Sequence, residues 1–332
     1  MAHVLVTGGA GYVATHALFS LLEAGHKIII VDNLCRGNLH LIPSHPDIVF
    51  IQGDILDPNL LFDTLQSYSI DAVMHYAALA YVEESYRKPD DYYRVNSLGT
   101  FNLLQAMVRY RPASPPPLVF SSSCAVYGDV SGSIIKETMD LLPISPYGKS
   151  KLCAEWMIKD FFNAYNLHYV ILRYFNAAGA DTNNRIGECH HPETHLIPLA
   201  IQAARTHQQF SVNGLDHPTK DGSALRDFVH VLDLASAHLL SLNYLLNGGK
   251  PSCFNLGSGA GFTVLEVLKL IELKFGKNIM LNIKSRRPGD PSSLVCDSSR
   301  ALHSLGWSPV HSSLEQIISD AIAWDRYCYG VG

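Results

Sequence analysis

Short apolar runs alternate with longer amphipathic stretches over the first half of the chain. The runs are rich in Val, Ile and Leu without strict in-and-out alternation, which is typical of strands buried on both faces of a parallel sheet. The expected strands are 4–7, 27–32, 48–54, 71–77, 118–123 and 169–175, and the expected helices are 12–24, 59–68, 92–110 and 147–165. This alternation predicts a doubly wound α/β fold with right-handed crossovers.

The pattern changes after residue 175. Residues 176–230 are rich in Asn, His, Pro and Gly and contain one expected helix near 196–206. A helix is expected again at 231–246, and 253–257 is expected to add a strand to the main sheet. A second small α/β region follows at 260–320, closed by a helix near 313–327. We therefore expect a nucleotide-binding (Rossmann) domain over 1–175, with returning segments near 231–258, and a smaller lobe formed by 176–230 and 259–332.

Composition narrows the class of protein without indicating its chemistry. The 332 residues include 25 Lys and Arg against 30 Asp and Glu, a net charge of −5 that argues against a nucleic-acid partner. No apolar stretch approaches the roughly 18 residues that span a membrane, and the N-terminus lacks the features of a signal peptide. Seven cysteines without a C-x-x-C spacing indicate reduced thiols. A cytoplasmic protein without a membrane partner is expected.

A glycine-rich turn follows the first expected strand directly and opens a helix. In T-G-G-A-G-Y-V-A at 7–14, Gly8 can form a tight turn and Gly11 lets the backbone approach a pyrophosphate. Asp32 ends the second strand, 21 residues beyond Gly11, where an acid receives ribose hydroxyls. A 2′-phosphate would be repelled there, so NAD is expected rather than NADP, although Arg36 lies nearby. The turn at 53–55 is a candidate adenine contact.

The candidate catalytic residues follow the fifth strand. Ser123 lies in S-S-S-C-A-V-Y-G at 121–128, and S-P-Y-G-K-S-K follows at 145–151. Tyr147 and Lys151 are four residues apart, so their side chains share one helix face. The ammonium, together with the charge of NAD+, is expected to lower the pKa of Tyr147 toward neutrality, so that it acts as a general base. Ser123 would hydrogen-bond the same substrate hydroxyl. A Y-x-x-x-K pair alone is usually an ordinary exposed pair, but here it follows a dinucleotide turn.

With these motifs the sequence resembles the extended short-chain dehydrogenase/reductase superfamily, and within it the UDP-glucose 4-epimerase family. The likeness covers essentially the whole chain. It includes V-D-N-L at 31–34, G-D-I at 53–55, M-H-Y-A-A at 74–78, L-R-Y-F-N at 172–176, N-L-G-S-G at 255–259 and R-P-G-D at 287–290, besides the motifs above and G-x-D-x-P-T-x-D-G-x-x-x-R-D-F-V-H-V at 214–231.

The resemblance implies a role for each matching position. The implied catalytic residues are Ser123, Tyr147 and Lys151. The implied NAD contacts are Gly8, Gly11, Tyr12, Val13, Asp32, Asn33, Asp54, Ile55, Tyr76, Ala77, Ala78, Asn96, Ser121, Tyr147, Lys151 and Tyr174. The implied UDP-sugar contacts are Ser123, Tyr147, Asn176, His195, Leu196, Ser211, Val212, Asn213, Arg226, Arg287 and Asp290. The two arginines suit a pyrophosphate, and Asp290 suits ribose hydroxyls.

The implied reaction is the NAD-dependent conversion of UDP-galactose to UDP-glucose through a transient 4-keto sugar. A nucleotide-sugar dehydratase would need an acidic pair after Ser123, where this chain has Cys124 and Ala125. A nucleotide-sugar decarboxylase would need a Glu near the same place to act on a uronate, and this chain has none there. A non-catalytic NAD-binding protein would be expected to have lost Tyr147 or Lys151.

Substrate choice within the family stays open. Leu294 occupies a position that the family uses to gate N-acetylated sugars, and a side chain of intermediate size leaves UDP-GlcNAc/UDP-GalNAc as an alternative. The loop at 78–85 resembles that of UDP-xylose/UDP-arabinose epimerases. In this loop Ala80 stands where some members have Lys, and Glu83 adds a charge near the site.

Two further features concern metals and assembly. The segment C-H-H-P-E-T-H at 189–195 superficially suggests a metal site, but adjacent histidines rarely converge on one ion and a second ligand set is missing, so no metal is expected. Tyr92, Tyr93, Leu103 and Leu104 form part of an apolar helical face. The resemblance places this helix beside the Tyr147 helix in a four-helix interface, which implies a homodimer.

Overall fold

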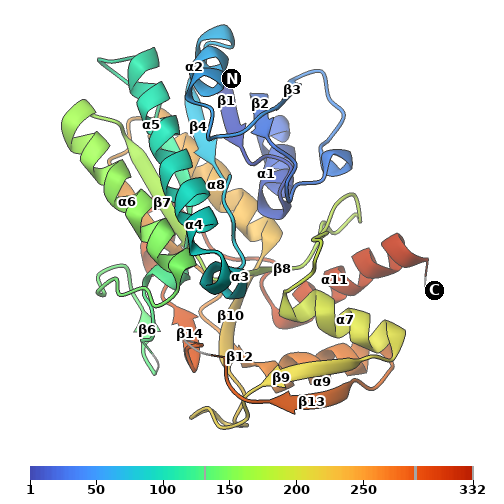
Figure 1. Ribbon diagram of the computed structural model, residues 1–332. Coiled ribbons are helices and arrows are strands. Elements are labelled where there is room, and N and C mark those ends of the chain that lie inside the picture. Colours follow the sequence, from blue (N-terminus) through green and yellow to red (C-terminus); the bar gives the residue numbers. More distant parts are fainter. Residues whose placement is uncertain (131, 288–289, 331–332) are drawn as a thin grey trace.

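A seven-stranded parallel sheet forms the centre of the computed structural model, which describes residues 1–130, 132–287 and 290–330 (Figure 1). Its strand order is β11-β7-β5-β4-β1-β2-β3. The strands are β1 (His3–Thr7), β2 (Lys27–Asp32), β3 (Ile48–Gln52), β4 (Ala72–His75), β5 (Leu118–Ser123), β7 (Tyr169–Tyr174) and β11 (Ser252–Leu256). The order reverses between β1 and β4, the switch point at which doubly wound sheets bind ligands. The predicted fold class is confirmed.

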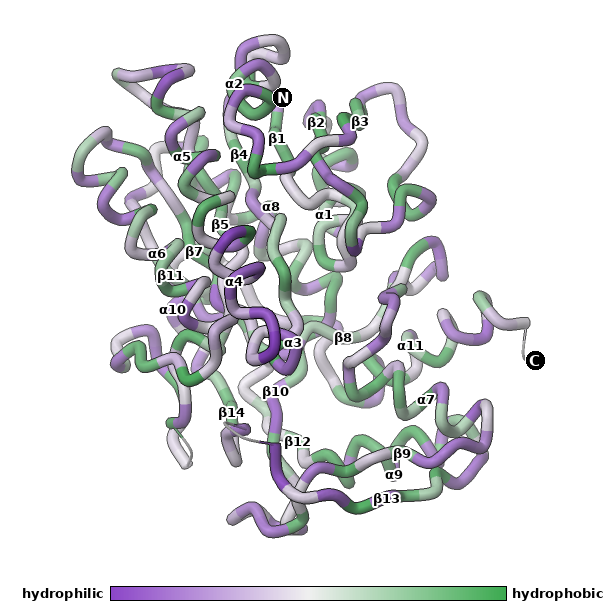
Figure 2. Tube along the Cα trace, viewed as in Figure 1, coloured by the Kyte–Doolittle hydropathy of each residue, from purple (hydrophilic) through white to green (hydrophobic). Residues whose placement is uncertain are grey.

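Helices cover both faces of this sheet. On one face lie α1 (Tyr12–Glu23), α8 (Val231–Leu246) and α10 (Ser299–Leu305), and on the other α2 (Pro58–Ser67), α5 (Gly99–Tyr110) and α6 (Pro146–Tyr165). Val4 and Val6 of β1 point into the first core, and Leu5 points into the second. Burial on both sides explains the unbroken apolar strands, which Figure 2 shows as mostly hydrophobic.

The rest of the chain builds a smaller lobe beyond the carboxyl ends of the central strands (Figure 1). One sheet contains β12 (Gly261–Thr263), β10 (Leu225–His230), β14 (Ser293–Cys296) and β6 (Ile134–Ile135), and β8 (Asn176–Ala178) also pairs with β10. A second sheet pairs β9 (Gln209–Asn213) with β13 (Met280–Lys284). A separate core lies among α7 (Leu196–Thr206), α9 (Val264–Phe275) and α11 (Leu314–Tyr329).

The predicted helix 92–110 is instead three segments. It consists of α4 (Pro89–Tyr92), a π-helical turn η2 (Tyr93–Leu98) and α5, preceded by α3 (Val82–Arg87). Wider turns of this kind are frequent at functional sites, and this one contains Asn96. The 3-10 turns η1 (Leu39–Leu41) and η3 (Cys124–Val126) complete the elements. No helix among the described residues combines the length and apolarity needed to cross a membrane.

Candidate functional site

The glycine turn lies at the switch point and fits a dinucleotide. Gly8 has a φ of +74°, and a Cβ there would lie 2.4 Å from the backbone nitrogen of Ala77, so only glycine fits. Helix α1 begins after Gly11, which has no side chain to cap it. The first N–H groups of the helix are therefore available to a pyrophosphate. Tyr12 and Val13 form the first turn, as predicted for NAD contacts.

Asp32 lies beside this turn. Its two carboxylate oxygens accept hydrogen bonds from the backbone N–H groups of Ala10 at 3.0 Å and Leu34 at 2.7 Å. Burial raises the pKa of the Asp32 carboxyl, and the two bonds oppose that rise. A carboxylate retains further lone pairs after two such bonds, so Asp32 can still accept ribose hydroxyls.

Arg36, the residue that could have favoured NADP, forms an ion pair with Glu84. Its guanidinium donates to both carboxylate oxygens of Glu84, at 2.8 and 2.9 Å, and lies over the ring of Tyr81. The fit is therefore to NAD, as expected. Asn33 donates to Asp54 at 2.9 Å, which joins the ends of β2 and β3 where the adenine contact was predicted.

The three predicted catalytic side chains come together at the carboxyl end of β5. Ser123 is the last residue of that strand, and its side chain lies close enough to Tyr147 to lower the pKa of the phenol. Ser145 caps α6, which places Tyr147 in the first turn of the helix. One turn later, the Lys151 ammonium donates to the backbone oxygen of Ser121 at 2.8 Å. All three side chains are buried.

Burial dominates the protonation of this site. It raises the pKa of Tyr147 well above its ordinary value, with Tyr174 adding to the rise and the nearby Ser123 side chain opposing it. Burial also lowers the pKa of Lys151 to about 7, and Glu155 opposes that fall. In the polypeptide alone the pKa of Tyr147 is therefore raised rather than lowered toward neutrality as expected, and Lys151 is not among the groups that shift it. Of the two expected causes, the charge of NAD+ is left to favour the phenolate.

A buried polar network below the site was missed by the sequence analysis. Glu155 accepts from the Arg173 guanidinium at 2.9 and 2.5 Å and from the Ser122 hydroxyl at 2.6 Å. Arg173 also donates to Tyr127, whose hydroxyl donates to Asn255 on the edge strand β11. This network fixes the neighbours of Ser123 and Lys151. Only Glu155, four residues after Lys151, carried a hint in the sequence.

The other predicted NAD contacts surround the same edge. The side-chain amide of Asn96 bonds to the loop at Leu79 and to α6. It accepts from the Leu79 N–H at 2.8 Å, and it donates to the Leu79 backbone oxygen at 3.0 Å and to the Ser150 hydroxyl at 2.9 Å. The geometry makes it a positioning residue. Tyr76 stacks on His238, and its buried hydroxyl has no hydrogen-bond partner among the described residues, so a polar atom there is left for a ligand.

The predicted UDP contacts gather in the smaller lobe. Arg226 on β10 forms an ion pair with Asp290, so the aspartate predicted to bind ribose also holds an arginine. The amide oxygen of Asn213, turned toward Arg287, accepts from its Nε and Nη2 atoms at 3.1 Å. Glu83 lies 3.8 Å from the same guanidinium. Pro288 and Gly289 of the R-P-G-D motif are outside the described residues.

The remaining predicted substrate contacts occupy element ends and one strand. Ser211 and Val212 lie with Asn213 on β9. Leu196 begins α7, and His195 directly precedes it. Asn176 on β8 donates to the backbone oxygen of Asp227 at 2.8 Å.

Leu294 is buried against Cys124, and its neighbour in register on β10 is Arg226. It therefore lies between the residue that follows Ser123 and a predicted pyrophosphate contact.

The predicted apolar helical face lies largely inside the chain. Tyr92, Leu103 and Leu104 have no exposed surface, and the two leucines pack in the core on one side of the central sheet. Of the four residues named for this face, only Tyr93 is exposed.

Comparison with known proteins agrees with this geometry. The model of the NAD dependent epimerase/dehydratase family matches residues 4–257. A UDP-glucose 4-epimerase of Halalkalibacterium halodurans is 43% identical over 324 residues, 97% of this chain and 95% of its own. The Brucella ovis UDP-glucose 4-epimerase in complex with NAD is 42% identical with a TM-score of 0.92, covering 97% of this chain and 98% of its own.

A third relative carries a different sugar. The Stenotrophomonas maltophila UDP-glucose-4-epimerase, with bound NAD and formylated UDP-arabinopyranose, is 37% identical with a TM-score of 0.93 and full coverage of both chains. The sequence match, the fold and the glycine turn agree. The chain belongs to the NAD dependent epimerase/dehydratase family.

Proposed function

We propose that this chain is an NAD-dependent UDP-glucose 4-epimerase that interconverts UDP-galactose and UDP-glucose. The observation that carries the proposal is the convergence of the Ser123 and Tyr147 side chains at the carboxyl end of β5, with Lys151 one turn further along α6. Relatives named UDP-glucose 4-epimerase match 97% of the chain at 41–43% identity, which supports this activity over dehydration.

Proton transfer falls to Tyr147 in this proposal. It takes the proton of the sugar 4-hydroxyl, while Ser123 holds that oxygen and steers the proton. Bound NAD+ supplies the reversible hydride acceptor for C4. After the 4-keto sugar has rotated in the site, C4 would regain the hydride on its opposite face while Tyr147 returns the proton to the oxygen.

The UDP moiety would hold the intermediate while the sugar turns. Arg226 and Arg287 offer two guanidinium groups in the smaller lobe, and each is already oriented by a polar partner. Such groups suit a pyrophosphate, since each provides several donors in a fixed plane. A firmly held nucleotide and a loosely held sugar are what inversion without net oxidation requires.

The proposed preference is for sugars without an N-acetyl group. Buried Leu294 packs against Cys124 and takes up space beside Arg226. A Stenotrophomonas relative is described with a UDP-pentose derivative, so UDP-arabinose is the second sugar to test.

The test is to incubate the purified chain with UDP-galactose, without added NAD, and to follow UDP-glucose by chromatography. Activity is expected because NAD co-purifies, and denaturation should release about one NAD per chain. The matched control is Tyr147→Phe, which keeps the ring and loses the hydroxyl. Absence of any UDP-sugar interconversion by NAD-loaded protein would falsify the proposal.

We also propose a cytoplasmic homodimer. Tyr93 and Leu98 on η2 and Trp156 on α6 are exposed apolar side chains on helical segments that pack together. A sedimentation experiment that finds only monomer at micromolar concentration would refute the proposed dimer.

A further inference from the structure

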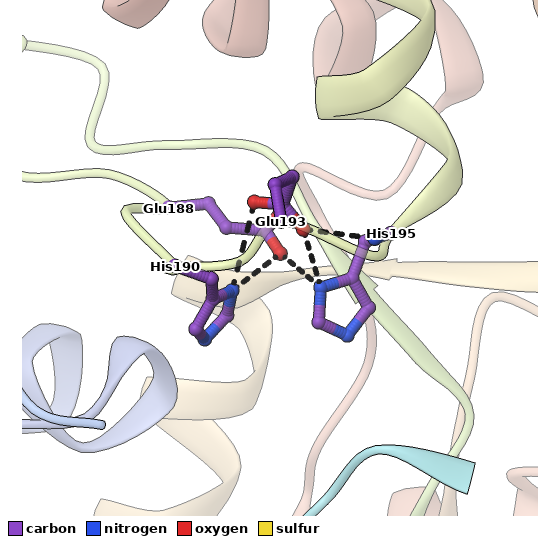
Figure 3. Close-up of side chains that lie close together, drawn as sticks. All are labelled: Glu188, His190, Glu193 and His195. Carbon is purple, nitrogen blue, oxygen red and sulfur yellow. Dashed lines mark hydrogen bonds and ion pairs between the residues drawn. The ribbon is translucent and has the colours of Figure 1, made fainter. Parts of the chain in front are cut away.

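Four side chains on the segment before α7 converge on one point. They are Glu188, His190, Glu193 and His195, and one potential ligand atom from each lies within 4.8 Å of all the others. Figure 3 shows both imidazoles turned toward the two carboxylates. The Nδ1 atom of His195 lies 2.6 Å from Glu188 and 3.0 Å from Glu193, and Nδ1 of His190 lies 3.1 Å from Glu188.

We propose that these four residues form a binding site for a single divalent transition-metal ion of the zinc class. From the sequence no metal is expected, because adjacent histidines rarely converge on one ion and a second ligand set is missing. That reasoning applies to His190 and exposed His191, but the converging pair is His190 and His195, five residues apart and interleaved with two glutamates.

The donor set identifies the class of ion. Two imidazole nitrogens and two carboxylate oxygens make four ligands, the number that zinc takes in closed tetrahedral sites. Mg²⁺ and Ca²⁺ prefer all-oxygen sites, so imidazoles disfavour them. The charges also balance, since two carboxylates neutralise a divalent cation while both histidines bind as neutral rings. The ion would replace the protons that now link the rings to Glu188 and Glu193.

The surroundings hold the ligands in place. The backbone N–H groups of Thr194 and His195 donate to Glu193 at 2.7 and 2.8 Å, and Trp324 donates to the backbone oxygen of Glu188 at 3.0 Å. Contacts of this kind orient metal ligands in known sites.

Two aromatic rings enclose the imidazoles. Tyr12 lies edge-on to His190, and Tyr81 lies edge-on to both His190 and His195. The buried Tyr81 hydroxyl has no hydrogen-bond partner among the described residues, so a polar atom beside the cluster is left unsatisfied by the protein.

The location suggests a structural role for the ion. His190 contacts Tyr12 in the first turn of the predicted cofactor helix, and His195 precedes the first residue of α7. A closed four-ligand site has no open position for substrate, so the ion would fasten the two helix starts that face the cofactor and the UDP moiety.

Metal binding can be measured without reference to activity. The NAD-loaded chain is stripped with a chelator, incubated with Zn²⁺ and desalted, and retained zinc is counted by mass spectrometry. Co²⁺ is then substituted, because its visible absorption reports four-coordinate geometry. The key variant is His190→Asn, and the matched control is His191→Asn, the neighbouring exposed histidine outside the cluster.

The proposal expects about one zinc per chain in the unchanged protein and in H191N, together with the spectrum of tetrahedral Co²⁺. H190N should bind zinc about a hundredfold more weakly or worse, since losing even an outer-shell partner costs about 10–100-fold. The melting temperature should rise with Zn²⁺ in the unchanged chain but not in H190N. No retained zinc in the unchanged chain, or equal retention by H190N and H191N, would overturn the proposal and leave an ion-pair cluster. Zinc retention by the unchanged chain tests the proposal even if H190N fails to fold.

Discussion

Glu155→Gln should destabilise the protein strongly although it keeps the shape of the side chain. Glu155 is fully buried, and its partner Arg173 has a side chain only 3% exposed. The amide can accept from one guanidinium nitrogen but carries no charge. Arg173 would then remain buried as an unpaired cation below the catalytic residues.

The expected cost is about 3–5 kcal/mol of unfolding free energy, the range seen when one partner of a buried ion pair is removed. A Coulomb estimate agrees, since unit charges about 4 Å apart interact by about 4 kcal/mol at an effective dielectric constant of about 20. At roughly 2 °C per kcal/mol for a chain of this size, the melting temperature should fall by about 6–10 °C.

The assay is thermal and urea unfolding of the NAD-loaded protein, with the double variant Glu155→Leu/Arg173→Met as the matched control. Removing both charges together should bring stability to within about 1 kcal/mol of the unchanged chain or above it. A loss below about 1 kcal/mol in E155Q, or a double variant no more stable than E155Q, would refute this reasoning.

E155Q should also change the pH dependence of kcat, independently of its effect on stability. Glu155 opposes the burial that lowers the pKa of Lys151 to about 7, so its loss should lower that pKa further. The lysine then loses its proton at lower pH. The alkaline limb of kcat should move to lower pH in both E155Q and the double variant, whatever their stability. An unmoved limb would contradict the electrostatic part of the argument.

Three other substitutions test the cofactor and sugar sites. Gly8→Ala should abolish NAD retention, because the new Cβ would lie 2.4 Å from the Ala77 nitrogen; a full complement of NAD after purification would contradict this. Glu84→Gln should weaken the hold on Arg36 and raise affinity for NADP relative to NAD, measured by titration of the cofactor-free chain; an unchanged ratio would show that this ion pair does not set the preference. Leu294→Ala should raise kcat/KM for UDP-GalNAc relative to UDP-galactose and cost about 2–5 kcal/mol of stability as a buried side chain is truncated. A smaller ratio would remove Leu294 from substrate choice.

Local features of the chain were predictable from sequence. Continuous apolar runs indicate buried parallel strands, the glycine turn and Asp32 have a fixed spacing, and the four-residue step from Tyr147 to Lys151 defines a helix face. Each depends on neighbours in sequence, so the residue types suffice.

Features that depend on contacts between distant segments were not predictable. The pairing of Arg226 with Asp290 spans 64 residues, and that of Arg36 with Glu84 spans 48. The π-helical turn around Asn96 leaves no signature in an otherwise helical pattern. Strand β13 is exposed at every position although Met280, Leu281 and Ile283 are apolar, so its residue types give no guide to its burial. The net effect of burial on Tyr147 also needed the three-dimensional surroundings.

The return of the chain to the central sheet has a consequence for folding. Strand β11 and helix α8 are made late in the sequence, yet β11 completes the sheet beside β7 and α8 packs on α1. A fragment ending after β7 would leave β7 without its neighbour and the apolar side of α1 uncovered, and uncovered apolar surface favours aggregation. We therefore expect that the first 175 residues do not fold as a free-standing module, and that synthesis must reach at least residue 256 before this sheet and its helices are complete.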